Sequence, residues 1–344
     1  MRLRENLSML HPQRHQYIER KTAAVRTETL IGDRMVRTIY SVVRENAPFL
    51  FSLLLSARSS AFFGYLNYDC PVRSKISNPL KMLNRLGISP DEIFGQAQDL
   101  TTYRKLFERK IRYWDVRPMD EDAACVVSPA DARVLIGSFC ETEDLFIKGK
   151  FFNYRELIGS DKPEWSAAFK EGDYAVFRLT PEKYHYNHAP VSGKVVDIYE
   201  INGRYHSCNP GAVVESITPF SKNRRVLTVI DTDVENGTGV GLVAMVEIVA
   251  LMIGRIVQCY STEQYDPAVP VTKGLFMEKG QPKSLFRPGS STTVLIFQKN
   301  RLRFSSDLLE NLNRKDVQSR FSMGFGRPLA ETELNVRETI GRAI

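Results

Sequence analysis

Residues 224–232 read RRVLTVIDT and residues 193–201 read GKVVDIYEI, and these two stretches decide the fold class. Both are short, rich in β-branched residues and bounded by Gly, Asn or Asp, which is the pattern of a β-strand. The pattern recurs in ACVVS (124–128), ARVLIGSF (132–139), YAVFRLT (174–180) and TTVLIFQ (292–298). The apolar run 239–260 is interrupted by Glu247, Gly254 and Arg255, which favours two core strands joined by a turn over a membrane span. We therefore expect a mostly antiparallel, β-rich body.

The first 120 residues have a helical period instead. In residues 30–46 the apolar side chains of Val36, Ile39 and Val43 recur at three and four residues, as on one face of an amphipathic helix. Residues 100–114 show the same period, with a basic opposite face that is either a solvated helix surface or a phosphate-binding one. We predict an α+β fold with a helical N-terminal region (1–120), a β-rich domain (121–344) and a polar helical tail after Ser305.

The segment APFLFSLLLSARSSAFFGYLNY (47–68) raises the question of membrane contact. A spanning helix needs roughly 20 apolar residues without a central charge, whereas Arg58 and several serines interrupt this one. We expect two helices, or a helix and a turn, over a span. Such a segment either packs on the core or lies in the membrane interface.

Charge and cysteine content restrict the setting of the protein. Lys and Arg outnumber Asp and Glu by 47 to 40 in 344 residues, a mild excess that suits an anionic partner such as a phospholipid surface. The basic residues are spread out and accompany no nucleic-acid-binding motif, so no nucleic-acid partner is expected. Five scattered cysteines without C-x-x-C spacing indicate neither disulfides nor a zinc site. No secretory signal follows Met1, so an intracellular protein is expected.

Three segments carry residues suited to catalysis. His185 and His188 lie in FRLTPEKYHYNHAPVSG (177–193), where the flanking prolines favour a turn or short irregular segment that projects both rings into one region. The alternative is that one histidine caps a strand end and the other lies on the surface. Asp131 follows Pro-Ala in SPADARV (128–134), a setting for an oriented carboxylate but also a common turn. The third segment, FRPGSSTT (286–293), has the pattern of a loop before a strand. Neither histidine has further ligands at metal-binding spacing, so no metal is predicted.

Together and in this order the segments resemble the phosphatidylserine decarboxylase family. Its patterns SP-x-DG-R-V, P-x-x-Y-H-x-x-H-x-P-x-x-G and KG-x-x-x-x-x-F-x-x-GS[ST] appear here as SPADARV, PEKYHYNHAPVSG and KGQPKSLFRPGSS. Further similar stretches extend the resemblance over nearly the whole chain: QYIERKTAAVRTE, DRMVRTIY, YRKLFERKIR, RPMDEDAACVVSPAD, FIKGKFFNYRELIG and SSDLLENL. The His-x-x-His segment and the GSS site are the specific parts.

The resemblance implies that the protein cuts its own backbone. The Ser290 hydroxyl would attack the carbonyl of Gly289, and β-elimination would leave a covalent pyruvoyl group at position 290, so the cofactor is pyruvate made from Ser290. His188 would be the general base and Asp131 would orient its imidazole. His185 would protonate the decarboxylated carbanion or handle the substrate carboxylate, although the two histidines could exchange roles.

The remaining implied roles concern the pocket and the reaction. Ser291 and Thr292 either supply hydrogen bonds to the oxyanion or form the turn, and Met245 is expected in a strand that lines the active site. The activity implied is conversion of phosphatidylserine to phosphatidylethanolamine and CO2 through a Schiff base, by a protein attached to the inner membrane surface. We expect its cleaved chains to stay together as a heterodimer and to form a homo-oligomer. The alternatives are decarboxylation of a soluble amino acid, or lipid-head-group binding without catalysis.

Three positions depart from the family pattern and bear on the substrate. Ala132 replaces the Gly of the SP-x-DG turn, and its methyl group could shift Asp131 if that position required a positive φ. Arg224 replaces an acidic residue, and Met245 stands where a small residue is common.

Overall fold

The computed structural model describes residues 14–30, 33–70, 73–139, 154–215, 219–250, 255–288 and 291–344. Within these residues a ten-stranded sheet forms the centre of the molecule. Its strands, in spatial order, are β11 (Phe276–Met277), β7 (Gly193–Ile201), β8 (Arg225–Asp231), β9 (Leu242–Val249), β13 (Ser291–Phe297), β5 (Asp173–Leu179), β4 (Ala132–Ser138), β15 (Glu331–Leu334), β1 (Gln16–Glu19) and β2 (Ala24–Thr27). Only the β1–β15 pairing in this sheet is parallel. The expected α+β fold with a mostly antiparallel body is confirmed.

Two smaller sheets complete the strand inventory of the described residues. One contains, in spatial order, β10 (Ile256–Gln258), β12 (Pro282–Phe286) and β6 (Tyr186–His188). The other contains β14 (Leu302–Phe304), β16 (Thr339–Ala343) and β3 (Cys125–Val127). The apolar run 239–260 supplies β9 and β10, which confirms two strands in place of a span.

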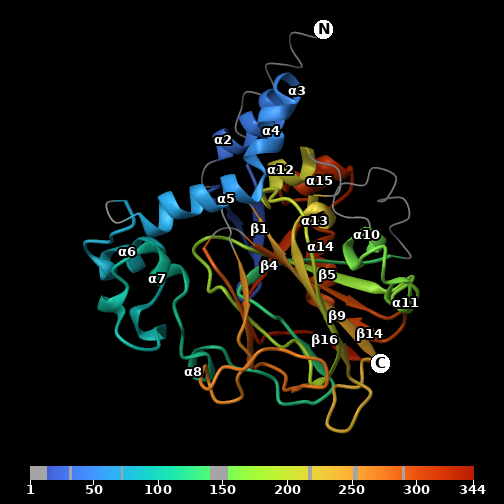
Figure 1. Ribbon diagram of the computed structural model, residues 1–344. Coiled ribbons are helices and arrows are strands. Elements are labelled where there is room, and N and C mark those ends of the chain that lie inside the picture. Colours follow the sequence, from blue (N-terminus) through green and yellow to red (C-terminus); the bar gives the residue numbers. More distant parts are fainter. Residues whose placement is uncertain are drawn as a thin grey trace.

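The helical segments divide between an N-terminal group and a group on the body (Figure 1). The N-terminal segments are α2 (Asp33–Thr38), η1 (Ile39–Val43), α3 (Arg44–Asn46), α4 (Pro48–Leu54), α5 (Ala57–Gly64), η2 (Tyr65–Asp69), α6 (Pro79–Arg85), η3 (Pro90–Glu92), η4 (Ala97–Asp99), α7 (Tyr103–Phe107) and α8 (Tyr113–Val116). The others are α10 (Tyr154–Ile158), α11 (Pro163–Ala168), α12 (Pro210–Glu215), α13 (Pro219–Lys222), α14 (Ser306–Leu312) and α15 (Arg320–Phe325).

Alternation along the central strands gives the large sheet two apolar faces. On β9, for example, Val243 and Met245 join one core cluster and Val246 joins the other. The first cluster also includes Phe286 and neighbours from the small sheets, whereas the second includes residues of α10, α13 and α15. The large sheet is therefore covered by the small sheets on one face and by helices on the other.

Local sequence signals explain the arrangement of the N-terminal helices. Helix α4 ends at Leu54, and Ser56 caps α5, because its hydroxyl accepts a hydrogen bond from the backbone N–H of Ser59 at 3.2 Å. Thr102 caps α7 in the same way through the N–H of Lys105. Segment 47–68 thus forms two helices, as predicted, and no helix among the described residues has the length and apolarity to cross a bilayer. In Figure 1, α4 stands above the sheet and α5 leads to the lobe with α6 and α7.

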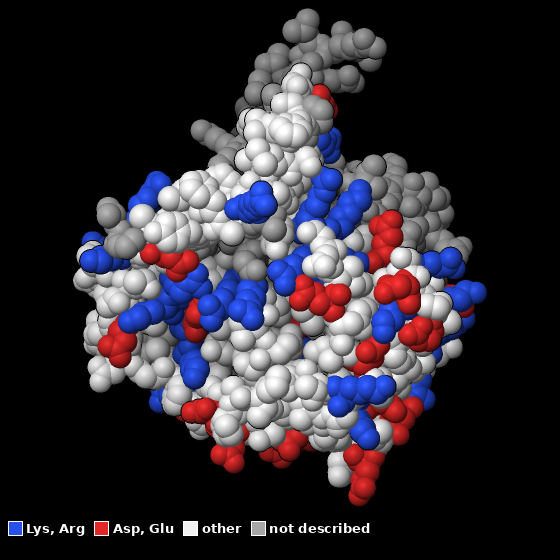
Figure 2. All heavy atoms as spheres, viewed as in Figure 1, with Lys and Arg blue, Asp and Glu red and all other residues white. Residues whose placement is uncertain are grey.

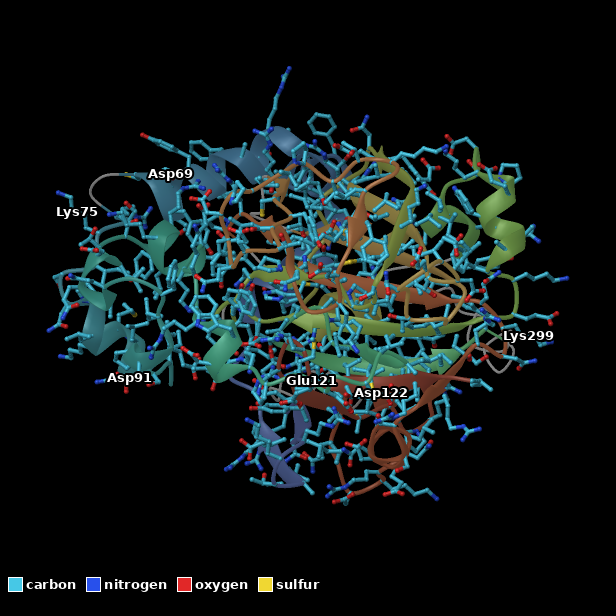
Figure 3. The ribbon with its side chains drawn as sticks, turned by 90° about the horizontal axis from the view of Figure 1, so that it is seen from below. Asp69, Lys75, Asp91, Glu121, Asp122 and Lys299 are labelled. Atoms are coloured by element: carbon cyan, nitrogen blue, oxygen red, sulfur yellow. The ribbon has the colours of Figure 1, made fainter. Side chains whose placement is uncertain are left out.

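Three expectations about the elements were wrong or incomplete. Residues 100–114 form two short helices, α7 and α8, in place of one. The N-terminal region also contains the β1–β2 hairpin, and the tail after Ser305 contains β15 and β16 besides its helices. Because β1 pairs with β15, both ends of the chain extend one edge of the large sheet. The division near residue 120 stays a prediction. In Figure 3, Asp69, Lys75 and Asp91 mark the lobe on one side of the sheets and Lys299 the opposite edge.

Candidate active site

His185 and His188 lie on or beside β6, which is a short strand and not the expected turn. Both side chains are fully buried. Because their spacing is odd, a strand directs them to opposite faces, and the two rings have separate contact partners. His185 stacks on Phe107 with ring centroids 3.6 Å apart, whereas His188 packs edge-on against Tyr113 at 4.7 Å.

The hydrogen bonds of His188 define its tautomer. Its Nδ1 lies 2.7 Å from the carbonyl oxygen of Gly280, which can only accept, so Nδ1 carries the proton. Its Nε2 then accepts from the hydroxyl of Tyr184 at 2.9 Å, and Tyr184 contacts the Tyr265 hydroxyl at 2.8 Å. Burial lowers the pKa of His188 to about 3. The ring is therefore neutral at pH 7, with Nε2 as a proton acceptor.

Gly280, which supplies that carbonyl, needs to be glycine. Its φ is +79°, a conformation that other residues adopt only with strain, and a Cβ there would lie 2.4 Å from the Met119 sulfur. The position of the His188 partner is thus fixed by the backbone of the KG motif.

His185 has an unused basic nitrogen. Its Nδ1 donates to the carbonyl oxygen of Lys183 at 2.7 Å, and its buried Nε2 has no hydrogen-bond partner among the described residues. Burial, together with the nearby positive charge of Arg109, lowers the pKa of this imidazole to about 3. Its Nε2 lone pair is free to accept a proton or a hydrogen bond from a ligand.

Asp131 is buried but contacts Arg117 in place of His188. The Arg117 guanidinium binds both carboxylate oxygens, with Nε at 3.1 Å and Nη2 at 2.8 Å, and the Val336 N–H donates to one of them at 2.8 Å. Burial opposes ionisation, but these contacts outweigh it and lower the pKa of Asp131. The link to His188 runs through the backbone, because the His188 N–H donates to the Pro129 carbonyl at 2.7 Å. The orienting role of Asp131 stays a prediction.

The three departures from the family pattern fit the structure without strain at the candidate residues. Ala132 is buried at the start of β4 and is not among the described residues with positive φ, so its methyl group does not strain the Asp131 turn. Arg224 forms an ion pair with Glu200 at the surface. Met245 is fully buried in the core on β9, opposite Leu295 of β13.

The predicted cleavage site, Gly289 and Ser290, lies outside the described residues. The next residues, Ser291 and Thr292, begin β13 and are buried. Neither hydroxyl has a hydrogen-bond partner among the described residues. Since an unpaired buried hydroxyl is unfavourable, both groups are available to a ligand or a neighbouring chain atom.

A cavity of about 620 Å³ adjoins the start of β13. Leu179 and Cys208 line it, and both contact Ser291: Leu179 is its cross-strand partner and the Cys208 sulfur lies 3.8 Å from its carbonyl oxygen. Most of the surface of its wall is apolar, and the N-terminal helices supply part of it through Leu54, Leu55 and Phe63. Its charged groups are those of Glu28, Arg73, Arg178 and Glu182. The cavity can therefore accommodate a ligand with an apolar body and a polar end.

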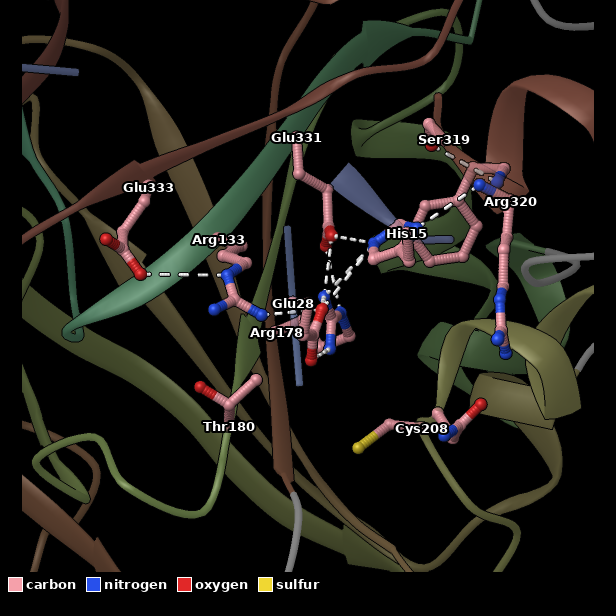
Figure 4. Close-up of polar contacts among 12 residues, drawn as sticks. His15, Glu28, Arg133, Arg178, Thr180, Cys208, Ser319, Arg320, Glu331 and Glu333 are labelled. Carbon is pink, nitrogen blue, oxygen red and sulfur yellow. Dashed lines mark hydrogen bonds and ion pairs between the residues drawn. The ribbon is translucent and has the colours of Figure 1, made fainter. Parts of the chain in front are cut away.

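Glu28 and Arg178, which line this cavity, belong to a buried charge cluster. Figure 4 shows the contacts within this cluster. The carboxylates of Glu28 and Glu331 both bind Arg178 at 2.6–3.0 Å, and His15 Nε2 lies 2.7 Å from Glu331. His15, Glu28 and Glu331 are close enough to ligate one metal ion, but Arg178 and Arg133 already balance the carboxylate charges. Because its charges are already paired, we interpret the cluster as structural. Arg178 lies on β5 opposite Thr292, so the cluster supports the start of β13.

Three side chains that contact or adjoin the candidate residues were not predicted from the sequence. Arg117 binds Asp131 and Tyr184 binds His188. No spacing in the sequence identifies Arg117 or Tyr184 as these partners. Arg178 could have been noticed, because an arginine inside the apolar strand YAVFRLT must find a buried partner.

Comparison with known proteins identifies the family. The family model of phosphatidylserine decarboxylase matches residues 103–324. A phosphatidylserine decarboxylase proenzyme of Fusobacterium nucleatum is 29% identical over 314 residues, covering 90% of this chain and 95% of the relative. Proenzymes of Clostridium tetani and Chlamydia pneumoniae are each 28% identical, covering 87% and 91% of this chain and 93% and 96% of theirs. The chain belongs to the phosphatidylserine decarboxylase family.

Proposed function

We propose that this protein is a self-cleaving, pyruvoyl-dependent decarboxylase that converts phosphatidylserine to phosphatidylethanolamine and CO2. Its membership of the family supports this activity, and the relatives are named as proenzymes, which fits a chain that is cut to become active. The observation that carries the proposal is the position of the cavity, which is mostly apolar and adjoins the residue after the predicted cut.

The residues around β13 fit a pyruvoyl group at position 290. That group would supply an electron-withdrawing carbonyl next to the substrate amine. Ser291 and Thr292 offer buried hydroxyls without partners among the described residues, which can bind carbonyl oxygen. During cleavage one of these hydroxyls would stabilise the oxyanion at Gly289, since neighbouring residues of a strand face opposite sides of the sheet.

The two histidines would divide the proton transfers. The neutral His188 can accept the Ser290 proton at Nε2, where Tyr184 now donates a hydrogen bond. His185 can hold a proton or a substrate oxygen at its free Nε2, beside the buried Arg109 whose Nε also lacks a partner among the described residues. Asp131, paired with Arg117, would fix the loop that bonds the His188 backbone.

The lipid would enter from the membrane surface through the N-terminal helices. Helices α4 and α5 and segment η2 expose large apolar side chains, with Phe49 83% and Phe62 57% exposed and Leu50, Leu53 and Tyr65 also on the surface. The same helices line the cavity with Leu54, Leu55 and Phe63. In Figure 2 the projection that contains α4 is mostly white, with Lys and Arg gathered at its base. An apolar tip above basic residues suits peripheral binding to anionic lipid.

After cleavage the two chains would remain together. β13 pairs on one side with β9 and on the other with β5, both of which precede the cut, over seven residue pairs each. The shorter chain would therefore stay embedded in the sheet as a heterodimer. A homo-oligomer remains an expectation from the family resemblance.

Turnover assays test the proposed activity. Purified protein is expected to release CO2 from phosphatidylserine in anionic vesicles and to leave free serine unchanged, with Ser290→Ala inactive on both. Release from serine alone would favour a decarboxylase of a soluble amino acid. Binding of vesicles without release from either would favour a non-catalytic lipid-binding protein.

A further inference from the structure

A buried polar network lies where β6, β9, β10, β12 and β13 approach one another. Five of its members are fully buried, and Gln258 closes it at the edge. Its side chains are those of Asn187, Glu247, Gln258, Lys283, Ser284 and Thr293. None of them has a role in the chemistry described above.

One half of the network is a buried ion pair. Lys283 Nζ lies 2.7 Å from Glu247 Oε2. The Gln258 amide bridges the pair, since its oxygen accepts from Lys283 and its nitrogen donates to Glu247, both at 2.8 Å. The Ser284 hydroxyl donates to the other oxygen of Glu247. Because desolvation offsets much of the attraction in a buried pair, such a pair is weak evidence of added stability. A geometric role accounts for it better.

The other half connects Glu247 to the histidine strand and to β13. The Asn187 amide nitrogen donates to Glu247 Oε1 at 3.2 Å and to the Ser284 hydroxyl at 3.3 Å. Its oxygen accepts from the Thr293 hydroxyl at 2.9 Å. Because the Glu247 carboxylate only accepts, it fixes which way the Asn187 amide faces, and the Thr293 hydroxyl donates to the amide oxygen.

The network spans the predicted cut. Lys283 and Ser284 lie on β12, before the cut, whereas Thr293 lies on β13, two residues after Ser291. Asn187 immediately precedes His188 on β6. These hydrogen bonds therefore join the strand after the cut to the strand that carries His188, and none of them involves the chain between β12 and β13.

We propose that Asn187, Glu247, Lys283 and Thr293 are positioning residues that hold β13 in fixed register against the histidine strand, both during self-cleavage and in the cut enzyme. This inference rests on the proposed function. Small displacements of reacting groups cost large factors in rate, so loss of one hydrogen bond in this network should slow the chemistry more than it weakens substrate binding.

Replacement of Thr293 tests the link to β13. Thr293→Val keeps the shape but removes the hydroxyl, and it should slow self-cleavage and lower kcat on phosphatidylserine vesicles about tenfold with KM within twofold. Thr293→Ser should restore both rates. The matched control is Thr228→Val, because the Thr228 hydroxyl is also buried but has no partner among the described residues; this variant should behave as wild type.

Two double variants test the ion pair without leaving a lone buried charge. Glu247→Gln with Lys283→Met keeps an acceptor for Asn187 and should cleave within threefold of the wild-type rate. Glu247→Met with Lys283→Met lacks that acceptor and should cleave about tenfold more slowly. Circular dichroism would verify folding of each variant.

The outcomes separate this inference from the proposed function. Wild-type cleavage and turnover together with unchanged rates in Thr293→Val and in the Glu247→Met double variant would overturn the positioning role alone. Equal slowing in Thr228→Val would overturn it too, because the effect would then come from core packing. Failure of wild-type protein to cleave would overturn the proposed function instead.

Discussion

The carboxylate of Asp131 is the candidate residue whose surroundings differ most from expectation. Its side chain and that of Arg117 are almost fully buried, and the guanidinium contacts both carboxylate oxygens of Asp131. Arg117 Nη2 also lies 3.0 Å from a carboxylate oxygen of Glu92. The structure therefore gives Asp131 a definite task, to neutralise a buried guanidinium beside the His188 loop. Asp131 also influences His188 through its charge. Burial lowers the pKa of His188, and the negative charge of Asp131 partly opposes this by raising it.

Replacement of Arg117 tests the importance of this pair. Arg117→Met would leave the Asp131 carboxylate buried without its partner, which typically costs about 3–5 kcal/mol in the free energy of unfolding. Urea denaturation in the Ser290→Ala background, where the chain stays whole, would measure the loss. Arg117→Met with Asp131→Leu should recover much of it. A loss below about 1 kcal/mol for the single variant, the range of a surface pair, would contradict the buried pairing.

At the scale of elements, the break at Ser56 separates a helix that projects from the body from one that lies on it. Helix α4 exposes Phe49 and Leu53, whereas Leu55 at the break is fully buried in a cluster with Val36 and Tyr40. The sequence of this segment allowed packing on the core or contact with the membrane. The structure shows packing at Leu55 and an exposed apolar surface at Phe49 and Leu53.

The exposed part predicts a defect in vesicle binding. Phe49→Ser with Leu53→Ser should weaken binding to anionic vesicles at least tenfold, because burial of each large apolar side chain is worth about 1.5–3 kcal/mol. Co-sedimentation with vesicles would measure it, and the thermal midpoint should stay unchanged. Leu309→Ser, at a 45% exposed position on α14, is the control and should bind as wild type. Equal binding by all three proteins would exclude this face as the lipid contact.

The elements predicted from sequence are those whose own residues determine them. RRVLTVIDT and TTVLIFQ carry enough β-branched residues to predict β8 and β13 locally. ETEL and TIGRA, the sequences of β15 and β16, have no such pattern and become strands through pairing with β4 and β3. β1 likewise becomes a strand through its pairing with β15. The Glu247–Lys283 contact was not predicted either, because its partners are 36 residues apart in the sequence. Long-range pairing leaves no periodic signal in one sequence.

For the whole molecule, buried neutral histidines predict sensitivity to acid. Burial lowers the pKa of His185 and His188 to about 3 and that of His206 to about 4. In the unfolded chain each imidazole has a pKa near 6.5. Between about pH 4 and 6.5 the unfolded state binds more protons, so stability must fall as pH falls through this window.

Urea unfolding of the Ser290→Ala chain at pH 5.0 to 7.5 would measure this effect. The free energy of unfolding should stay level above about pH 7 and decrease below pH 6.5, by up to roughly 1.4 kcal/mol per pH unit for each imidazole. The lowered carboxyl pKa values of Asp131 and Glu331 add losses only at lower pH. A free energy independent of pH from 5.0 to 7.0 would contradict the buried neutral state of these rings.

Intact mass spectrometry of purified protein tests the central claim, self-cleavage before Ser290, most directly. Two chains of about 33 and 6 kDa are expected, which divide the 39.2 kDa in proportion to 289 and 55 residues, and the shorter one should begin in a pyruvoyl group. Ser290→Ala should give one uncut chain. A wild-type chain that stays whole after prolonged incubation, or one cut elsewhere, would contradict it.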